Sequence, residues 1–327
     1  MLSGKTILIT GGTGSFGKAF VKKALTDYDL KKIIVYSRDE FKQYQMQQMF
    51  PSNKLRFFIG DVRDEKRVYR ALTGGVDFVI HAAAMKQVPA SEYNPFEAVQ
   101  TNIMGAQNVI SATLEAGVSK VVALSTDKAC NPVNLYGATK LCSDKLFIAA
   151  NAYAGKMVTR FAVVRYGNVI GSRGSVVPLY KELAATGELP VTDDRMTRFW
   201  ITLPQAVQFV ADSFAIMNGG ELFIPKIPSM KITDLAEAVA PGCRLKIIGI
   251  RPGEKLHEMM ISRDDSRNLY ELPDRYIKMP DFPFWKTILP EGAVSVEEGF
   301  EFASDTNRQW LNVEQLREVL NQDGVIE

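Results

Sequence analysis

Short apolar runs alternate with amphipathic stretches along the first half of the chain. The runs occupy positions 5–10, 33–36, 55–59, 76–80, 121–124 and 158–166. Uninterrupted apolar runs of this length are typical of parallel strands that are buried on both faces, and the stretches between them have helical spacing. The pattern therefore predicts an α/β fold with a doubly wound parallel sheet.

Glycines follow the first apolar run. Gly11, Gly14 and Gly17 have the spacing GxxGxxG and lead into a helical stretch. Glycines at these positions allow a sharp turn and a close approach to a pyrophosphate, and the helix N-terminus offers N–H groups to phosphates. A tight turn without a ligand is the alternative. The order strand, glycines, helix predicts a Rossmann-type dinucleotide-binding domain, and the candidate cofactor contacts in this turn are Gly11, Thr13, Gly14, Ser15, Phe16 and Gly17.

The second run ends in Ser37, Arg38 and Asp39. A carboxylate at this strand end binds the 2′-hydroxyl of the adenosine ribose, whereas Arg pairs with a 2′-phosphate. Ser37 and Arg38 favour NADP. Asp39 leaves NAD open, and it is equally suited to cap the helix expected at 40–49.

The third and fourth runs end in further cofactor candidates. Asp61 could reach the adenine amino group, with Val62 beside it, or it could cap the helix expected at 64–72. Small residues after the fourth run, Ala82 and Ala83, would let the ribose and diphosphate lie against the backbone, and Lys86 follows them. A long helical stretch is expected at 95–116.

The candidate catalytic residues lie in the stretch 121–140. Thr126, Asp127 and Lys128 follow a buried strand, at the edge where open α/β sheets bind ligands. Tyr136 and Lys140 are four residues apart, so on a helix they share a face. We expect these side chains to look into one crevice.

These residue types suit a two-stage reaction on a sugar. Lys140 would favour the Tyr136 phenolate, which removes a hydroxyl proton while hydride leaves the same carbon. Once C4 is a ketone, Lys128 could take the C5 proton, provided that burial and Lys140 lower its pKa. Asp127 could protonate the 6-hydroxyl as water leaves, and hydride would return to C6. A surface ion pair is the alternative for Asp127 and Lys128.

The regular rhythm ends after the sixth run. We expect residues 1–168, together with about 201–228, to form the NADP-binding domain. About 169–200 and 229–327 would form a smaller α+β substrate-binding lobe. The segment RPGEKLHE at 251–258 places basic and acidic side chains around a Pro-Gly turn, which predicts either a diphosphate clamp or a solvated turn.

Composition narrows the function classes. The 39 basic and 37 acidic residues nearly balance, which gives no field to attract nucleic acid or a membrane. Three cysteines without a CxxC pair and an amino-terminal region without a signal-peptide pattern lead us to expect a cytoplasmic protein. The two histidines have no neighbouring ligand cluster, so no metal site is expected, and His81 is expected to be a core residue.

In combination, the motifs TGGTGSFG, SRDE, AAAMKQVP, STDKACNPVNLYGATK and RPGEKLHE resemble those of the extended short-chain dehydrogenase/reductases. Within that family they resemble the UDP-N-acetylglucosamine 4,6-dehydratases that invert C5. The resemblance implies Asp127, Lys128 and Tyr136 as catalytic residues, with Lys140 and Thr126 supporting them. It implies NADP that is reduced and reoxidised within one turnover. It also implies a UDP-sugar near Lys86, Asn168, Arg173, Arg251 and Glu254, a homo-oligomer built from dimers up to a hexamer, and a first step toward pseudaminic acid-type sugars.

Two departures favour the inverting type. The membrane-anchored dehydratases that retain C5 geometry usually carry Met where this chain has Tyr136, and dTDP-glucose dehydratases typically have Asp-Glu in place of Asp127 and Lys128. A UDP-hexose 4-epimerase is the alternative enzyme, although it has no use for Asp127 beside Lys128. A catalytically silent NADP-binding scaffold is the alternative from another class, although it would be expected to lose Tyr136 or Lys140.

Overall fold

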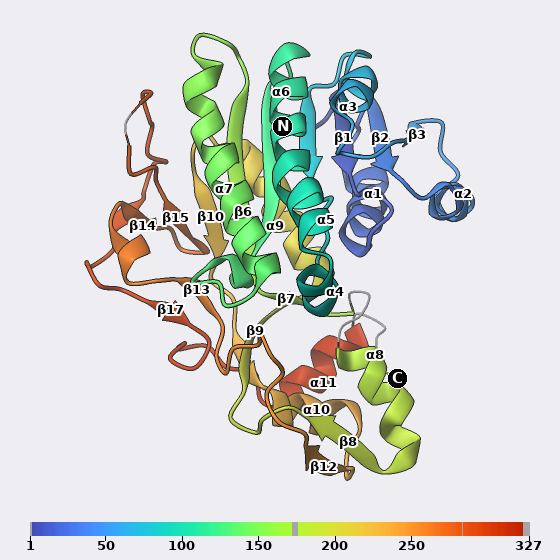
Figure 1. The fold of residues 1–327 in the computed structure, drawn as a ribbon, viewed down its shortest axis with the longest axis vertical. Helices are drawn as coiled ribbons and strands as arrows, with labels where there is room; N and C mark the ends of the chain where they lie inside the picture. Colours follow the sequence, from blue (N-terminus) through green and yellow to red (C-terminus); the bar gives the residue numbers. More distant parts are fainter. Residues whose placement is uncertain (1, 172–175, 283, 323–327) are drawn as a thin grey trace.

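The computed structural model describes residues 2–171, 176–282 and 284–322. A large part, built on one extended sheet, lies above a smaller part in Figure 1. The large sheet has the strand order β16-β14-β15-β10-β6-β5-β4-β1-β2-β3. The run from β10 to β3 is parallel, as the alternating pattern predicts, and the strands beyond β10 are antiparallel.

The parallel strands coincide closely with the apolar runs. They are β1 (Thr6–Thr10), β2 (Lys32–Ser37), β3 (Leu55–Ile59), β4 (Phe78–His81), β5 (Lys120–Thr126), β6 (Arg160–Tyr166) and β10 (Leu222–Pro225). Continuous burial along β1, β2 and β5 explains why these runs contain almost no polar interruption.

Helices cover both faces of this sheet. On one face, α3 (Glu65–Leu72), α6 (Gly105–Glu115) and α7 (Leu135–Ala154) pack in a row, and on the other α1 (Ser15–Asp27) packs against α9 (Leu203–Ile216). The helix α2 (Glu40–Met49) contacts β2 and β3. One apolar core joins these layers.

The expected long helix at 95–116 is interrupted. It consists of α5 (Pro95–Val99), a π-helical turn η1 (Gln100–Met104) and α6, and the short helix α4 (Val88–Tyr93) precedes it. Asn102 in the π-helical turn accepts a hydrogen bond from the Met85 N–H (2.8 Å) and donates to the Met85 carbonyl (2.9 Å) and Thr139 Oγ1 (3.0 Å). Such π turns occur often at functional sites.

The smaller part has its own apolar core, which includes Trp200, Leu235 and Leu316. Its strands are β7 (Asn168–Val169), β8 (Glu188–Val191), β9 (Thr197–Ile201), β11 (Ser229–Lys231) and β12 (Arg244–Ile247). Its helices are α8 (Val176–Leu183), α10 (Ile232–Val239) and α11 (Val313–Gln322), and a short 3-10 turn, η3, lies at Ala184–Thr186. Two other 3-10 turns lie at Asp127–Ala129 (η2), directly after β5 of the large sheet, and at Asp264–Ser266 (η4).

The expected assignment of all of 229–327 to the smaller lobe is corrected in one segment. The strands β14 (Leu269–Glu271), β15 (Arg275–Lys278) and β16 (Val294–Ser295) extend the large sheet, because β15 pairs antiparallel with β10. The pair β13 (Met259–Ile261) and β17 (Phe302–Ala303) buries its apolar side chains in the large core. Short antiparallel strands joined by tight turns can extend a sheet edge without a helical crossover, so the earlier strand-helix rhythm does not reveal them.

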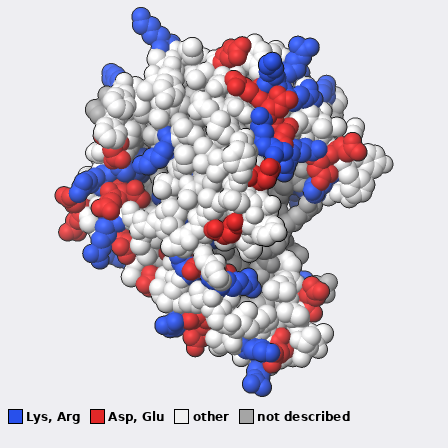
Figure 2. Space-filling model, in the orientation of Figure 1, with Lys and Arg blue, Asp and Glu red and all other residues white. Residues whose placement is uncertain are grey.

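On the face shown in Figure 2, basic and acidic side chains are interspersed in groups toward the margins, and a notch separates the two parts. In the described part of the chain, none of the helices combines the length and the apolar character that membrane crossing requires.

Candidate active site

A cavity of about 940 Å³ lies at the carboxyl ends of the parallel strands and is lined by residues of both parts of the molecule. All described candidates from the sequence line it. They are Gly11, Thr13, Gly14, Ser15, Phe16, Gly17, Ser37, Arg38, Asp61, Val62, Ala82, Ala83, Lys86, Thr126, Asp127, Lys128, Tyr136, Lys140, Asn168, Arg251 and Glu254. The remaining candidate, Arg173, lies outside the described residues.

The glycine turn leaves no room for side chains. Gly11 has φ +64°, and a Cβ atom there would lie 2.8 Å from the Cα of Ala83. A Cβ on Gly17 would lie 2.1 Å from the Gly12 carbonyl oxygen. The helix α1 begins just beyond, and its N-cap Gly14 provides no side-chain cap. This close backbone and uncapped helix end fit the diphosphate of a dinucleotide.

The ends of β2 and β3 carry an exposed cluster of charges. Arg38 Nη1 lies 3.5 Å from Asp61 Oδ2, and Arg63 Nη2 lies 2.8 Å from the same oxygen. Burial raises the pKa of Asp61, but the hydrogen bonds and charges from Arg63, together with the charge of Arg38, outweigh it and leave the pKa lowered. Asp39 caps α2, because its carboxylate accepts a hydrogen bond from the Lys42 N–H at 2.9 Å.

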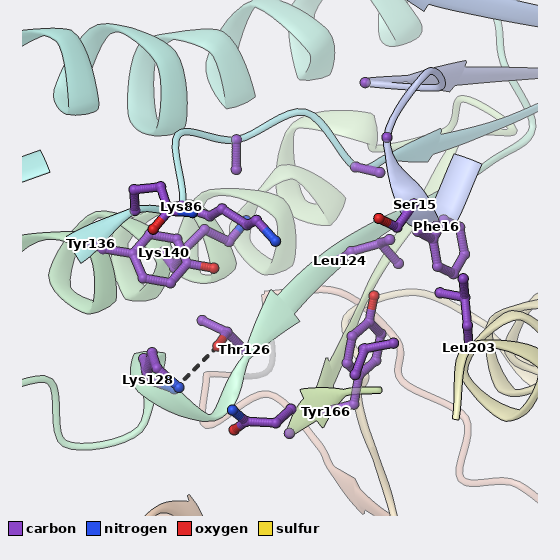
Figure 3. A pocket seen from close by; sticks show the side chains of 18 of the residues that line it. Ser15, Phe16, Lys86, Leu124, Thr126, Lys128, Tyr136, Lys140, Tyr166 and Leu203 are labelled. Carbon is purple, nitrogen blue, oxygen red and sulfur yellow. Dashed lines mark hydrogen bonds between the residues drawn. The ribbon is translucent and has the colours of Figure 1, made fainter. Parts of the chain in front are cut away.

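The helix α7 carries Tyr136 and Lys140 on one face. Asn134 caps the helix by accepting from the Gly137 N–H at 2.7 Å, and its amide donates to the Gly253 carbonyl at 2.8 Å. The catalytic candidates on α7 are thereby tied to the turn at 251–254. Figure 3 shows Tyr136 and Lys140 together on one side of the pocket, with Lys86 beside them and Lys128 nearby.

Lys128 lies between two buried carboxylates. Its Nζ is 3.1 Å from Asp127 Oδ1 and 3.2 Å from Glu258 Oε1. Asp127 is 1% exposed and Glu258 is 2% exposed. Thr126 Oγ1 donates to Asp127 Oδ1 at 2.9 Å, which fixes the carboxylate further. The pair is therefore not the surface ion pair that the sequence left as an alternative.

The expected direction of the Lys128 pKa is corrected. Burial lowers this pKa, but the charges of Asp127 and Glu258 outweigh burial, so the net pKa is raised. Burial raises the pKa of the Asp127 carboxyl, with Lys128 opposing and Glu258 adding to the effect. A carboxyl that favours its protonated form suits a proton donor, and an amine with a raised pKa is a strong proton acceptor once it is neutral.

The cation that acts on Tyr136 is Lys128, whereas the sequence led us to expect Lys140. Burial raises the pKa of Tyr136 to about 12, and the charge of Lys128 and a hydrogen bond with Thr126 act in the opposite direction. Burial lowers the pKa of Lys140, and the Asp144 carboxyl opposes that effect.

His81 is buried, with Nδ1 2.9 Å from Thr10 Oγ1, and burial lowers its pKa to about 3, as befits the core residue expected from the sequence.

The turn at 251–254 places charged groups at the cavity. Arg251 Nη1 lies 3.8 Å from Glu254 Oε1, and the Arg251 side chain is 58% exposed. Asn168 is partly buried, and its Oδ1 has no hydrogen-bond partner among the described residues. These polar atoms are positioned to meet a polar ligand that enters between the two parts.

Sequence reasoning missed residues that the smaller part contributes. Arg198 and Trp200 on β9 line the cavity, and Glu258 contacts Lys128. The alternation of Arg198 and Trp200 along a strand indicates that they share a face. Glu258 belongs to RPGEKLHE, the segment that predicts either a diphosphate clamp or a solvated turn, and no sequence spacing connects it to Lys128.

The fold and site define a class, the Rossmann-type α/β enzymes with a large cavity at the carboxyl ends of the parallel strands. The family model for polysaccharide biosynthesis proteins matches residues 7–280. The chain is 59% identical to a UDP-N-acetylglucosamine 4,6-dehydratase (inverting) from Campylobacter jejuni, over 98% of both chains. It is 42% identical to a UDP-glucose 4-epimerase from Rickettsia canadensis, over 98% of this chain and 96% of that one.

A solved structure agrees across the whole length. The X-ray structure of Pen from Bacillus thuringiensis is 38% identical in sequence and has a TM-score of 0.92. The match covers 100% of this chain and 100% of that one. The chain therefore belongs to the polysaccharide biosynthesis protein family.

Proposed function

We propose that this protein is an NADP-dependent UDP-N-acetylglucosamine 4,6-dehydratase that inverts C5. It would be a hydro-lyase whose product is UDP-2-acetamido-2,6-dideoxy-β-L-arabino-hex-4-ulose. The reaction would be an opening step toward pseudaminic acid-type sugars. The observation that carries the proposal is the 3.1 Å contact between buried Asp127 and partly buried Lys128 in the same cavity as Tyr136. The 59% identity to the inverting dehydratase of Campylobacter jejuni supports the choice of substrate.

The residues that would hold the cofactor are those of the glycine turn and the adjoining strand ends. The backbone around Gly11 and Gly14 would hold the diphosphate, and Arg38 would pair with a 2′-phosphate. Asp61 and Val62 would lie against the adenine, and Ala82 and Ala83 against the ribose and diphosphate. When bound, the nicotinamide accepts hydride from C4 of the sugar and later supplies it to C6.

Tyr136 would begin the reaction. Its Oη takes the proton of the 4-hydroxyl as the C4–H bond breaks, and Lys140 holds a ribose hydroxyl. Because burial raises the pKa of Tyr136 to about 12 in the protein alone, nearby positive charge must promote its ionisation. Lys128 already supplies such a charge.

Asp127 and Lys128 would carry out the elimination. The C5 proton, made acidic by the C4 ketone, moves to Lys128 Nζ, and Asp127 gives its proton to the 6-hydroxyl, which leaves as water. Thr126 positions Asp127 through the 2.9 Å hydrogen bond. Lys86, Asn168, Arg173, Arg251 and Glu254 would surround the UDP-sugar, with the arginines binding its diphosphate.

The protein would work in the cytoplasm as a homo-oligomer built from dimers. The near balance of charge gives no reason to expect nucleic acid or a membrane as a partner.

A UDP-hexose 4-epimerase is the second candidate, because a relative with that name is 42% identical over nearly the whole chain. The experiment that separates the two is mass spectrometry of the product after incubation with UDP-N-acetylglucosamine and with UDP-glucose. A dehydratase gives a product lighter by one water, whereas an epimerase gives a product of unchanged mass. Unchanged mass together with a changed C4 configuration would overturn the proposed dehydration.

A further inference from the structure

Glu258 contacts Lys128 from outside the large cavity. It precedes β13 and is anchored through its backbone, because its N–H donates to Ser304 Oγ at 2.9 Å and its carbonyl accepts from the Ser304 N–H at 2.8 Å. It lines a separate small cavity of about 170 Å³ and is not among the residues that line the large one. Lys128 lines both cavities. Glu258 therefore reaches Lys128 from the small cavity, which also shares Asn168, Arg198, Arg251 and Glu254 with the large one.

The carboxylate of Glu258 is held as an anion. Burial raises its pKa, but the charges of Lys128, Arg198 and Lys255 outweigh burial and lower it overall. Arg198 Nε lies 3.9 Å from Glu258 Oε1. The second oxygen, Glu258 Oε2, is buried without a hydrogen-bond partner among the described residues. An incompletely bonded buried anion is costly for folding, which is typical of a functional arrangement.

We propose that Glu258 is a positioning residue that holds Lys128 Nζ between two carboxylates and stabilises the ammonium that forms when Lys128 takes the C5 proton. This inference rests on the proposed dehydration. Glu258 acts only through Lys128, which it contacts at 3.2 Å.

The proton count of the elimination closes within this group. The C5–H bond breaks, its electron pair forms the C5–C6 double bond, and its proton binds the neutral Lys128 amine. The C6–O bond breaks, and the oxygen leaves as water with the proton of Asp127. The site then holds Lys128 ammonium and Asp127 carboxylate, and proton transfer across the 3.1 Å Nζ–Oδ1 contact restores the starting state. Glu258 stays ionised throughout these steps, and it lies beside the ammonium once Lys128 has taken the proton.

Other charged groups around Lys128 define what a pH experiment would report. Asp127 lies next to it in the chain, Tyr136 faces it from α7, and Arg198 on β9 lowers its pKa. Glu258 raises the Lys128 pKa. Removal of the Glu258 charge alone must therefore lower the pKa of Lys128.

The test is Glu258→Gln, which keeps the size of the side chain and removes its charge. On the plateau of the pH–rate profile, where Lys128 is neutral, we expect kcat for dehydration to fall about 100-fold with KM nearly unchanged, because a less basic amine takes the C5 proton more slowly. Bound reduced cofactor should accumulate during turnover, because C4 oxidation continues while elimination is slow. The limb of the pH–rate profile that reports Lys128 should move to lower pH. Glu258→Asp, which restores the charge, should recover part of kcat and return the limb toward its wild-type position.

The matched control is Glu221→Gln. Glu221 is fully buried, but it accepts hydrogen bonds from the N–H groups of Asn218 and Gly219 and lines neither cavity. The control should leave the pH profile unchanged even if it lowers stability. An unchanged kcat and pH limb in Glu258→Gln would overturn the positioning role. So would a loss of C4 oxidation that Glu258→Asp does not recover, since that indicates collapse of the site.

Failure of the proposed function is distinguishable from failure of this inference. If the wild-type protein converts no UDP-sugar, the dehydratase proposal itself is wrong. If the wild type dehydrates its substrate and Glu258→Gln does so equally well, only the role of Glu258 is wrong.

Discussion

Two clusters of charge lie at the cavity, and they contain the same kinds of ion pair in opposite surroundings. In the exposed cluster, Arg38 and Arg63 meet Asp61, and the Arg38 side chain is 63% exposed. In the buried cluster, Lys128 meets Asp127 and Glu258, whose side chains are 1% and 3% exposed. The distances are similar, from 2.8 to 3.5 Å. Burial is the main difference between the two.

The comparison shows how environment gives similar pairs different uses. Water and salt screen the exposed pairs, so they contribute little to stability and remain available to bind an anion. The buried pair is screened much less, and its protonation states are coupled to one another. We therefore expect substitutions in the exposed cluster to change cofactor preference, and substitutions in the buried cluster to change chemistry and pH dependence.

The largest effect is expected for Lys128→Met. Removal of the amine eliminates the acceptor of the C5 proton, so dehydration should fall at least about 10³-fold, within the range of general acid–base catalysis. C4 oxidation should persist and be visible as absorbance of bound NADPH. Full dehydration activity in this variant would contradict the role of Lys128.

A smaller effect, on stability, is expected for Asp127→Asn. Because the folded-state pKa of Asp127 is raised, its stabilising contribution is present below its unfolded pKa, near 4, and is lost as pH rises through the folded pKa. The Asp127→Asn variant has no carboxyl to ionise, so it does not lose this stability as pH rises. Its free energy of unfolding relative to wild type should increase from about pH 4 to pH 7, on the order of 1 kcal/mol per unit of pKa change.

Chemical denaturation at several pH values measures this trend, and Glu258→Gln is the matched comparison. The folded-state pKa of Glu258 is lowered, so its contribution is present above the unfolded pKa and is lost as pH falls through the folded pKa. The free energy of unfolding of Glu258→Gln relative to wild type should therefore decrease as pH rises, which is the opposite of the trend for Asp127→Asn. Parallel trends in the two variants would argue against the assigned charge states.

In the exposed cluster, Arg38→Ala should weaken NADP binding about tenfold and leave NAD binding nearly unchanged. Loss of a charge-assisted contact with the 2′-phosphate is the reason, and isothermal titration of both cofactors is the measurement. Added salt should reduce the difference between wild type and variant. Equal losses for NADP and NAD would show that Arg38 does not recognise the 2′-phosphate.

The smallest effect is expected for Arg63→Ala. Arg63 joins Asp61 to Glu97 with contacts of 2.8 and 2.7 Å, but Glu97 is largely exposed. Thermal unfolding should show a loss of no more than about 1 kcal/mol, and activity should be retained. A loss of several kcal/mol would remove the contrast between the two clusters.

The sequence predicted the parallel core and the large cavity well, because both follow local rules. Apolar runs specify buried strands, the glycine spacing specifies the turn before α1, and polar residues after β5 must lie at the carboxyl edge of the sheet. The helix expected at 40–49 is α2 with the same bounds, and Asp39 takes the capping role that the sequence had left open.

Other features depend on contacts between distant segments. Glu258 reaches Lys128 from a segment far away in the sequence, and its charge reverses the pKa direction expected for Lys128. The strand β15 joins the large sheet through pairing with β10, which its short sequence RYIK does not reveal. In the π-helical turn, Asn102 bonds to Met85 and Thr139, which are also distant from it in sequence.

The most direct test of the account is NMR of UDP-N-acetylglucosamine incubated with the purified protein in deuterated water, with no cofactor added. We expect a 4-keto-6-deoxy sugar nucleotide that carries deuterium and inverted configuration at C5. That result would establish dehydration, proton exchange at C5 and a retained cofactor together. A substrate that stays unchanged after NADP is supplied, or a product that keeps its 6-hydroxyl, would contradict the account.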